Sequence, residues 1–485
     1  HRRCLLREKE GLYLLQTPDI KRIARRTFGR RVEQIRRQIR REQSVYRDVE
    51  QFFGQAGFDV NPLDSEYLLR PGAPARLPWG DVWAWLRLGE PLTPDEITEL
   101  DGLARERNLS GPAFIVIAER PTPAAYRALM ARNASDAPPL VPVDAQSIRR
   151  ALAQRNPADT LDTLIRRAQP GYNHFALYTP VEDSLDFFGR QNILQTLAGR
   201  LTGGDPLLLT TVRGLPRVGL TSLLRRLQTR LEAIPCAAAS LQYEQDAAGL
   251  RFAITRSLLQ EARRKTPGAT LSPLVARLSP ARPGDPAVGQ VFEALQQLSA
   301  RQRAGRKFVV LVDATGPAAA AQTGLLREAR SLAEAHPRLA FVLAANTFDQ
   351  ADLTLRPLSA AEAGTMVQSL LAAAGRDDWP PPVMDALFHY SGGHPWLLRQ
   401  LGSALFKLDR FLEPADVEAA ALALVERRSA YFEGLWDSLP QTAQNGLLNP
   451  SAGETTLPRE LGLPTGLLQL WLELELGLEF EPGSL

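Results

Sequence analysis

The feature that most constrains this chain is a glycine-rich turn between an apolar run and a helical segment. The run Leu207–Val212 is continuous, and Thr221–Arg230 has helical character. Between them the sequence reads Gly-Leu-Pro-Arg-Val-Gly-Leu-Thr-Ser, from Gly214 to Ser222. Glycines in such a turn let backbone N–H groups face an anion, and a helix N-terminus adds a favourable dipole. The segment therefore predicts a phosphate loop, with a glycine-rich turn that binds no ligand as the alternative.

One position departs from the usual phosphate-loop pattern. The pattern Gly-x4-Gly-Lys-Thr/Ser is matched except at the lysine, which is Leu220 here. That lysine lies between the β- and γ-phosphates of a nucleotide, and losing a desolvated charge contact of this kind costs about 2–5 kcal/mol. The hydroxyl of Thr221 can still bind Mg²⁺. We therefore expect a weakened or inactivated nucleotide site.

A second element of the same kind of site lies about 90 residues further on. Phe308–Asp313 is an apolar run that ends in a carboxylate. At the tip of a strand beside the phosphate loop, Asp313 would be the catalytic residue and would hold Mg²⁺ through water. Thr221 would be the second metal-binding residue. The next residue is Ala314, where many hydrolysing relatives carry a glutamate that polarises the attacking water. A core strand that ends in a capping aspartate is the alternative.

The rest of the chain divides into regions of different character. Strand-like and helix-like segments alternate over residues 187–357, which predicts an α/β domain with a parallel sheet and crossover helices. The strand-like segments after the loop are Cys236–Tyr243, Phe308–Asp313 and Leu339–Ala345, and the helical ones are Leu250–Lys265 and Gln322–Ala335. Residues 358–425 are expected to form a helical lid, and residues 426–485 a small winged helix. A small α/β domain is expected over residues 46–170, followed by a linker at Gln169–Asp186.

Composition narrows the classes of protein that fit. The chain has 485 residues, of which 44% are hydrophobic and 23% charged, as in folded globular proteins with two to four domains. No apolar run approaches the roughly 18 residues of a membrane span, so we expect no membrane partner. The only cysteines are Cys4 and Cys236, which excludes a disulfide framework and favours the cytoplasm. The histidines show no ligand spacing to either cysteine, so no zinc site is expected.

The amino-terminal segment, residues 1–45, is basic and is predicted to be helical. Residues 1–50 hold 15 Lys and Arg against 7 Asp and Glu, a local excess of +8. Apolar residues recur at mostly helical spacing from Ile20 to Ile39. Such a segment can bind nucleic acid, because each neutralised phosphate releases counterions. A solvated helix face or a contact with a partner helix is the alternative.

At this point four motifs resemble the STAND-type AAA ATPases of bacteria and archaea. Phe187-Phe-Gly-Arg190 is similar to the aromatic–Gly-Arg motif that lies near the adenine, and the loop with Arg217 resembles the family's Gly-x-x-Arg-x-Gly-Lys-Thr-Ser. Phe308–Asp313 resembles the Walker B strand. Ser391–Leu398 resembles the Gly-Gly-His-Pro segment of the helical lid, and Leu355–Ser359 its connector. The resemblance covers roughly 220 of the 485 residues.

The resemblance implies a site for ATP or ADP with Mg²⁺. The nucleotide-binding residues that it implies are Phe188, Gly189, Arg190, Gly214, Arg217, Gly219, Leu220, Thr221, Ser222, His394 and Pro395. It also implies that Leu220 and Ala314 impair hydrolysis, and that Leu220→Lys would strengthen binding more than it restores turnover.

The amino-terminal half resembles, more weakly, a restriction-endonuclease-like domain of the Mrr kind. The helix with Asp48 and Glu50, the Gly57-Phe58 turn, the strand Phe114–Ala118 and the short strand Leu140–Val143 carry this likeness. Nuclease chemistry needs clustered carboxylates and a lysine. The core strand instead reads Asp-Val-Trp-Ala-Trp-Leu-Arg from Asp81, so we expect an inactive descendant, with a generic α/β domain as the alternative. Trp83 and Trp85 could stack on bases, although core or interface packing is the more common use of such residues.

Two functions from different classes are consistent with these features. The first is a STAND-like nucleotide-binding regulatory or defence ATPase with impaired hydrolysis, in which an amino-terminal sensing or effector domain is coupled to assembly, with a homo-oligomer as one candidate form. The second is a DNA-binding or scaffold protein built on a catalytically dead NTPase fold. An active nuclease is disfavoured by the missing Glu-x-Lys. Nucleotide content after gentle purification separates the first two.

Overall fold

The structure, a computed structural model, describes most of the chain. The described residues are 7–9, 12–14, 44–63, 66–72, 81–88, 90–107, 109, 111–135, 137–177, 179–181, 185–202, 209–231, 236–240, 247–265, 271–302, 308–315, 319–336, 339–346, 351–408, 410–437, 439, 441–448 and 465–477. No helix within them combines the length and the apolar character needed to cross a bilayer.

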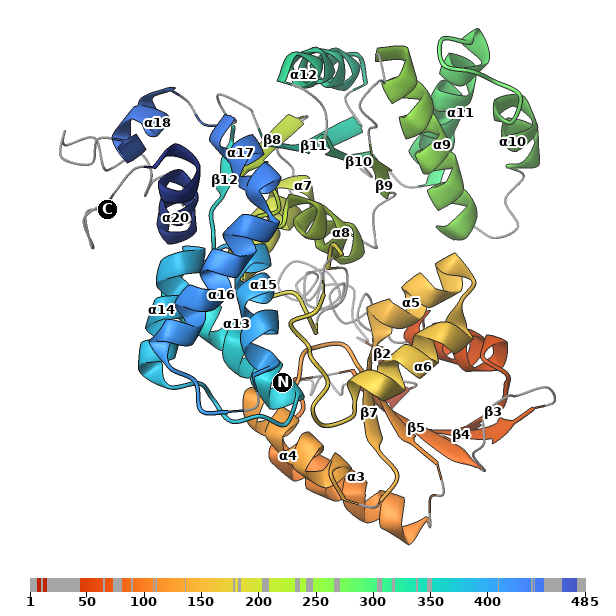
Figure 1. The fold of residues 1–485 in the computed structure, drawn as a ribbon. Helices are drawn as coiled ribbons and strands as arrows, with labels where there is room; N and C mark the ends of the chain where they lie inside the picture. Colours follow the sequence, from red (N-terminus) through yellow and green to blue (C-terminus); the bar gives the residue numbers. More distant parts are fainter. Residues whose placement is uncertain are drawn as a thin grey trace, which may run out of the picture.

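A five-stranded parallel sheet forms the centre of the region that carries the glycine-rich loop (Figure 1). Its strands are β8 (Leu209–Gly214), β9 (Cys236–Ser240), β10 (Phe308–Asp313), β11 (Leu339–Ala345) and β12 (Leu353–Leu355). Their order across the sheet is β12-β8-β11-β10-β9, and every pairing is parallel. Parallel strands all end at one edge, so the loop after β8 and Asp313 at the end of β10 lie at the same edge. The expected α/β fold class, a parallel P-loop sheet with a helical lid, is confirmed.

Helices cover both faces of this sheet, because its strands alternate apolar side chains between two cores. Val309 and Leu311 of β10 pack with α7 (Gln191–Thr202) and α8 (Leu220–Arg230). The intervening residues of β10 pack on the opposite face with α9 (Ala247–Lys265), α11 (Pro286–Gln302) and α12 (Ala319–Ala335), and α10 (Ser272–Leu278) adds to this layer. Burial on both faces explains why these strands read as continuous apolar runs.

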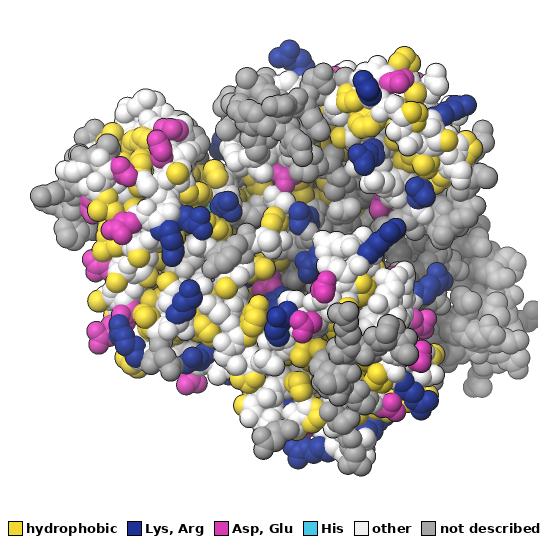
Figure 2. Space-filling model, turned by 45° about the vertical axis from the view of Figure 1, so that its right-hand side comes forward, with side chains coloured by type: hydrophobic (Ala, Val, Ile, Leu, Met, Phe, Trp, Pro, Cys, Tyr) yellow, Lys and Arg dark blue, Asp and Glu magenta, His cyan; other side chains and the backbone are white. Residues whose placement is uncertain are grey.

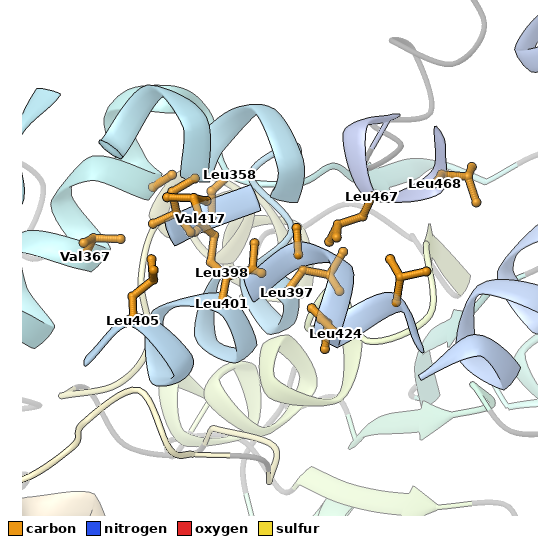
Figure 3. Close-up of a cluster of buried hydrophobic side chains, with 14 of the residues drawn as sticks. Leu358, Val367, Leu397, Leu398, Leu401, Leu405, Val417, Leu424, Leu467 and Leu468 are labelled. Atoms are coloured by element: carbon orange, nitrogen blue, oxygen red, sulfur yellow. The ribbon is translucent and has the colours of Figure 1, made fainter. Parts of the chain in front are cut away.

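The carboxy-terminal region is helical and has one shared core. Its helices are α13 (Ala360–Ala373), α14 (Pro381–Ser391), α15 (Pro395–Phe406), α16 (Pro414–Arg427), α17 (Ser429–Asp437), α18 (Gln441–Leu448) and α20 (Thr465–Leu476). Figure 3 shows leucines of α15, α16 and α20 converging, among them Leu398, Leu424 and Leu467. The boundary expected at 425/426 therefore falls inside a continuous core. The described part of 426–485 is helical, and the winged helix stays a prediction.

A second sheet forms the amino-terminal α/β region. Its strands, in spatial order, are β3 (Phe58–Leu63), β4 (Glu66–Pro71), β5 (Val82–Arg87), β6 (Ala113–Ile117) and β7 (Leu140–Asp144). The first three strands pair antiparallel and the last three pair parallel. The helix of residues 44–55, α5 (Ala145–Gln154) and α6 (Pro157–Arg167) cover one face, and α3 (Pro94–Glu106) and α4 (Pro123–Asn133) cover the other.

The two tryptophans of β5 have different surroundings, and neither matches the base-stacking hypothesis well. Trp85 is fully buried between β5 and helix α3, so its ring cannot meet a base. Trp83 is partly buried under the guanidinium of Arg107, which lies 3.7 Å from its ring centre. The alternation of strand side chains places both rings on the side that α3 covers, which favours the core-packing alternative.

The helical prediction for residues 1–45 is wrong at residues 7–9 and 12–14, although residues 44–45 begin a helix. Arg7–Lys9 (β1) and Leu12–Leu14 (β2) pair as two antiparallel strands. Helical spacing of apolar residues begins only at Ile20, so residues 7–14 never carried the helical pattern themselves. Residues 15–43, which hold most of the predicted helix, lie outside the described residues.

Candidate nucleotide-binding site

The loop after β8 has the backbone that its glycines predict. A Cβ added to Gly214 would lie 2.7 Å from Val218 Cγ1 and 3.0 Å from the carbonyl oxygen of Leu355, so only glycine fits there. Gly219 has φ +109°, a left-handed value that a side chain would strain. Arg217 also has a left-handed backbone, with φ +63°. Helix α8 begins directly after this turn, so its free N–H groups face the carboxyl edge of the sheet.

The side chain at the lysine position is packed into the protein. Leu220 is only 3% exposed and belongs to the apolar cluster between the sheet and helices α7 and α8. It also lines the cleft above the loop. Leu220 thus closes the floor of the cleft with an apolar surface where a cation would otherwise meet two phosphates.

Asp313 and the two residues around it form a hydrogen-bonded group at the tip of β10. Its Oδ2 accepts a 2.5 Å hydrogen bond from the Thr221 hydroxyl, and its Oδ1 accepts one of 2.7 Å from the Thr315 hydroxyl. Asn346, directly after β11, donates from Nδ2 to the Thr315 carbonyl at 3.0 Å. Carboxylate, hydroxyl and amide oxygens are suitable ligands for Mg²⁺ or for the waters around it.

Ala314, the next residue after Asp313, does not face the cleft. It is fully buried in the core under α9, α11 and α12, and its N–H donates to the carbonyl of Ala344 at 2.8 Å. Thr315 rather than Ala314 lines the cleft. A glutamate at position 314 would therefore have to leave the core to reach an attacking water.

A cleft of about 250 Å³ lies above the loop, and its walls come from segments far apart in the sequence. Among the residues that line it are Pro180, Val181, Phe187, Phe188, Arg190, Arg217, Gly219, Leu220, Thr221, Ser222, Thr315, Asn346, Leu358, Met366, Pro395, Trp396 and Arg399. Three of the apolar members, Phe188, Leu358 and Met366, belong to one apolar cluster and form an apolar wall of the cleft. The cleft thus combines an apolar wall, which suits a flat apolar group, with a glycine-rich loop, which suits an anion.

The segment 187–190 forms one wall through an unusual backbone. Gly189 and Arg190 both have left-handed φ values, +61° and +67°. A Cβ on Gly189 would lie 2.8 Å from Glu362 Oε1 and 2.9 Å from Leu358 Cδ2. Burial lowers the pKa of Arg190 to about 10, and the carboxylate of Glu362 opposes this change. Arg190 therefore stays charged, and its buried Nη2 has no hydrogen-bond partner among the described residues.

The histidine of the Gly-Gly-His-Pro segment supports the loop from outside the cleft. His394 is fully buried, and burial lowers its pKa to about 4, so the ring is neutral at neutral pH. Its Nε2 lies 3.0 Å from the Pro216 carbonyl, which can only accept, so Nε2 carries the proton. The hydroxyl of Tyr431 donates to the same carbonyl at 3.3 Å. Pro395 lines the cleft, whereas His394 does not.

The sequence-predicted residues therefore divide into two groups. Those that line the cleft are Phe188, Arg190, Arg217, Gly219, Leu220, Thr221, Ser222 and Pro395. Gly189, Gly214 and His394 shape the walls or the loop from behind, and Asp313 contacts the cleft through Thr221 and Thr315. The Ser222 hydroxyl accepts a 2.9 Å hydrogen bond from the Val181 backbone, so it fastens the linker to helix α8.

Sequence reasoning missed a buried ionic cluster at one end of the cleft. Asp186 accepts from Arg167 Nη2 at 2.6 Å and from Arg399 Nη2 at 3.2 Å. Burial alone would raise the pKa of this carboxyl, but the two guanidinium groups hold it well below its usual range. Burial, with the same two arginines, also lowers the pKa of His174 to about 3. Arg167 belongs to α6, Asp186 to the linker and Arg399 to α15, so no local pattern linked them.

A second missed residue ties the amino-terminal region to the cleft wall. Arg120 follows β6, and its Nε donates to the Leu185 carbonyl at 2.8 Å while Nη2 donates to that of Phe187. Its guanidinium carbon lies 3.5 Å from the ring centre of Phe188, which lines the cleft. Helix α4 of the same region packs against α13 of the lid (Figure 1). The cleft wall at residues 185–188 is thus contacted by both the amino-terminal region and the lid.

This chain shows similarity to known proteins only at the level of solved structures. The sequence matches no protein-family model and no curated protein. Among solved structures it is similar to the ORC2 protein of Aeropyrum pernix in ADPNP–ADP complexes (16% identity, 62% of this chain, 82% of that chain, TM-score 0.31). It is also similar to a RuvB variant of Thermotoga maritima (14%, 61% and 91%, TM-score 0.31) and to PCH-2 of C. elegans (14%, 58% and 66%, TM-score 0.20). At these scores the fold assignment rests on the sheet order and loop of this chain itself.

Proposed function

We propose that this protein is a nucleotide-binding regulator built on a P-loop domain, and that it hydrolyses ATP slowly or not at all. The observation that carries the proposal is the convergence of the linker, segment 187–190, the glycine-rich loop, the tips of β10 and β11 and the start of α15 around one cleft. Nothing local requires these segments to meet. A cleft with an apolar wall, a loop of backbone N–H groups and an aspartate–threonine pair suits a nucleoside di- or triphosphate with Mg²⁺.

The cleft offers hydrogen-bond donors for a nucleotide but lacks groups that would promote its hydrolysis. The buried Arg190 Nη2 and the free N–H groups of α8 are donors that suit anionic or carbonyl oxygens. In contrast, Leu220 presents no donor, and Ala314 lies in a core rather than beside the cleft. Both observations favour a site that holds nucleotide without hydrolysing it quickly.

The regulatory part of the proposal rests on the contacts between regions. Arg120 of the amino-terminal region and Arg399 of the lid both bind the segment 185–188 that forms a cleft wall. A nucleotide that orders this wall would change how the two regions meet, which is the form of coupling expected for a STAND-like signalling or defence switch. In this scheme the amino-terminal region, whose likeness to Mrr-type domains stays a hypothesis, is the sensing or effector domain of a cytoplasmic protein that works as a homo-oligomer.

A second candidate function is a DNA-binding or scaffold protein on a dead NTPase fold. The observation that favours it is the buried Leu220, because an apolar side chain stands where a cation would bind the phosphates of a nucleotide. In this case the residues around the cleft serve only to join the lid and the two α/β regions.

Nucleotide content decides between the two candidates. The full chain is purified rapidly at low salt, extracted with acid, and the extract is analysed by chromatography. ADP and ATP are then titrated by calorimetry with Mg²⁺. Co-purified nucleotide, or binding at concentrations below about 1 mM, is expected for the regulator. Absence of both would overturn that proposal and leave the scaffold.

A further inference from the structure

We propose that Arg217, in the loop itself, is the cation that binds the terminal phosphates in place of the missing lysine. This inference rests on the proposed nucleotide-binding function and names the residue on which it depends. Among the described residues, the basic side chains that line the cleft are Arg190, Arg217 and Arg399. The three differ in how far their charge is already engaged.

Arg399 is engaged by the buried ionic cluster. Its Nη1 donates to the His174 carbonyl at 2.9 Å, and its Nη2 donates to Asp186 at 3.2 Å. Moving it to a phosphate would leave Asp186 with one cation fewer in a buried place, which is costly.

Arg190 belongs to the wall rather than to the loop. Its Nη1 donates to the Pro357 carbonyl at 3.4 Å, and it faces the carboxylate of Glu362. A donor at this wall suits a ligand group that packs on Phe188 and Leu358, which also line the cleft and share one apolar cluster.

Within the described part of the chain, the charge of Arg217 is engaged only by an aromatic ring. Its guanidinium carbon lies 5.0 Å from the ring centre of Trp396 in the lid, its side chain is exposed, and no carboxylate of the described residues forms an ion pair with it. An exposed cation–π contact is weak compared with a charge-assisted pair, so a phosphate can displace it. The planar guanidinium can then donate two parallel hydrogen bonds to phosphate oxygens.

The backbone of Arg217 supports a ligand-directed role. Its φ of +63° is unusual for a residue with a long side chain, and such strained positions are concentrated at binding sites. Arg217 is three residues before Leu220 on the same turn, so its side chain starts beside the position that lysine would fill. The Pro216 carbonyl before it is fixed by His394 and Tyr431, which holds this turn in place.

The contact with Trp396 gives the inference a consequence for the lid. When Arg217 turns to a phosphate, Trp396 loses the guanidinium above its ring and keeps Tyr431, whose ring centre lies 4.6 Å away. Binding of a di- or triphosphate is therefore transmitted to α15 and α17 through one side chain. A nucleoside monophosphate is too short to draw Arg217 away from the ring in the same way.

The test compares Arg217→Gln with a matched charge change, Arg230→Gln, at the exposed far end of α8. Calorimetry of the full chain with ADP is expected to show about 10- to 100-fold weaker binding for R217Q, as for loss of a hydrogen bond to a charged group. R230Q is expected to match the original, and AMP affinity is expected to stay the same in all three. Adding Leu220→Lys to R217Q is expected to restore ADP affinity, because it returns a cation to the same phosphates.

Two results would overturn the inference, and they differ from each other. If the original binds ADP and R217Q binds it equally well, Arg217 is not the phosphate cation, while the proposed function stands. If the original binds neither ADP nor ATP, the inference falls together with the proposed function. Should R217Q fold poorly, Arg217→Lys decides instead: it keeps the charge but loses the planar fork, so a smaller loss of ADP affinity than for removal of the charge is expected.

Discussion

The hydroxyl of Thr221 donates a 2.5 Å hydrogen bond to Oδ2 of Asp313, a residue 92 positions later in the chain. The two residues lie at the start of α8 and at the end of β10, and β11 separates their strands in the sheet. Parallel pairing brings both to one edge, where Asp313 aligns with Ala344 and Ala344 aligns with Val212. The parallel pairing of the strands and the start of α8 after β8 thus account for the meeting of the pair that the sequence assigned to Mg²⁺.

Leu220→Lys is expected to raise the affinity for ADP or ATP by about 30-fold or more, because it adds a desolvated charge contact to the phosphates. The new ammonium can reach the cleft that Leu220 lines while its stem stays in the apolar cluster. Calorimetry measures the gain. Leu220→Met, which keeps the volume without the charge, serves as the control and should bind like the original.

Phosphate release by Leu220→Lys is expected to remain low. Turnover is expected only when Ala314→Glu is added, and at a cost in stability, because position 314 lies in the core under α9, α11 and α12. Phosphate release and thermal unfolding, measured for the single and the double variant, check both statements. Brisk hydrolysis by the original chain would contradict the assignment of an impaired site.

Folding stability is expected to fall between pH 7 and pH 5, in part because of His394. Its folded pKa of about 4 is below the unfolded value near 6.5, so the unfolded chain binds the extra proton first. The stability linked to this group is present above pH 6.5 and is lost as pH falls toward 4. The loss in the free energy of unfolding is about 2 kcal/mol at pH 5. Urea unfolding of the original and of His394→Asn across this range measures the slope. An unchanged slope in the variant would show that His394 is not the titrating group.

Arg120 is expected to couple the amino-terminal region to the cleft, unlike its neighbour Arg127. Arg120→Ala removes three contacts with residues 185–188 and should weaken nucleotide binding by about 5-fold or more, as for loss of about 1 kcal/mol. Arg127 also joins this region to the lid, through Asp378, but this pair is exposed and should contribute little. Calorimetry on both variants gives the comparison, and equal effects would remove the proposed role of Arg120.

The basic segment at the amino terminus is expected to bind nucleic acid in a salt-dependent manner. Residues 1–50 carry a local excess of +8, whereas both signs of charge are interspersed over the face drawn in Figure 2. Reversing Arg22, Arg25, Arg26 and Arg30 should weaken binding to duplex DNA and flatten the dependence of log K on log salt by about 0.9 per lost phosphate contact. Binding that is insensitive to salt would instead favour a protein partner.

The sequence by itself determined the buried strands and the turn between β8 and α8. Phe308–Asp313 and Leu339–Ala345 are covered on both faces, so their apolar runs stand out without any partner being known. The glycines of the loop were equally visible, because a left-handed φ and a close backbone approach can be met by glycine alone at low cost. The same reasoning failed for β3 and β4, whose exposed and mixed residues carry little periodic signal.

Only the tertiary structure decided which side chains share the site and which do not. Arg120, Asp186 and Arg399 are distant in sequence, and each alone reads as a surface charge. The fold buries Asp186 and Arg399 together and brings the half-buried Arg120 to the neighbouring carbonyl of Leu185. Likewise, the sequence could not tell that His394 supports the loop from behind, or that Ala314 faces a core while Thr315 faces the cleft. Local pattern determines whether a segment forms a strand, a turn or a helix. The contacts of a side chain depend in addition on segments that are distant in the sequence.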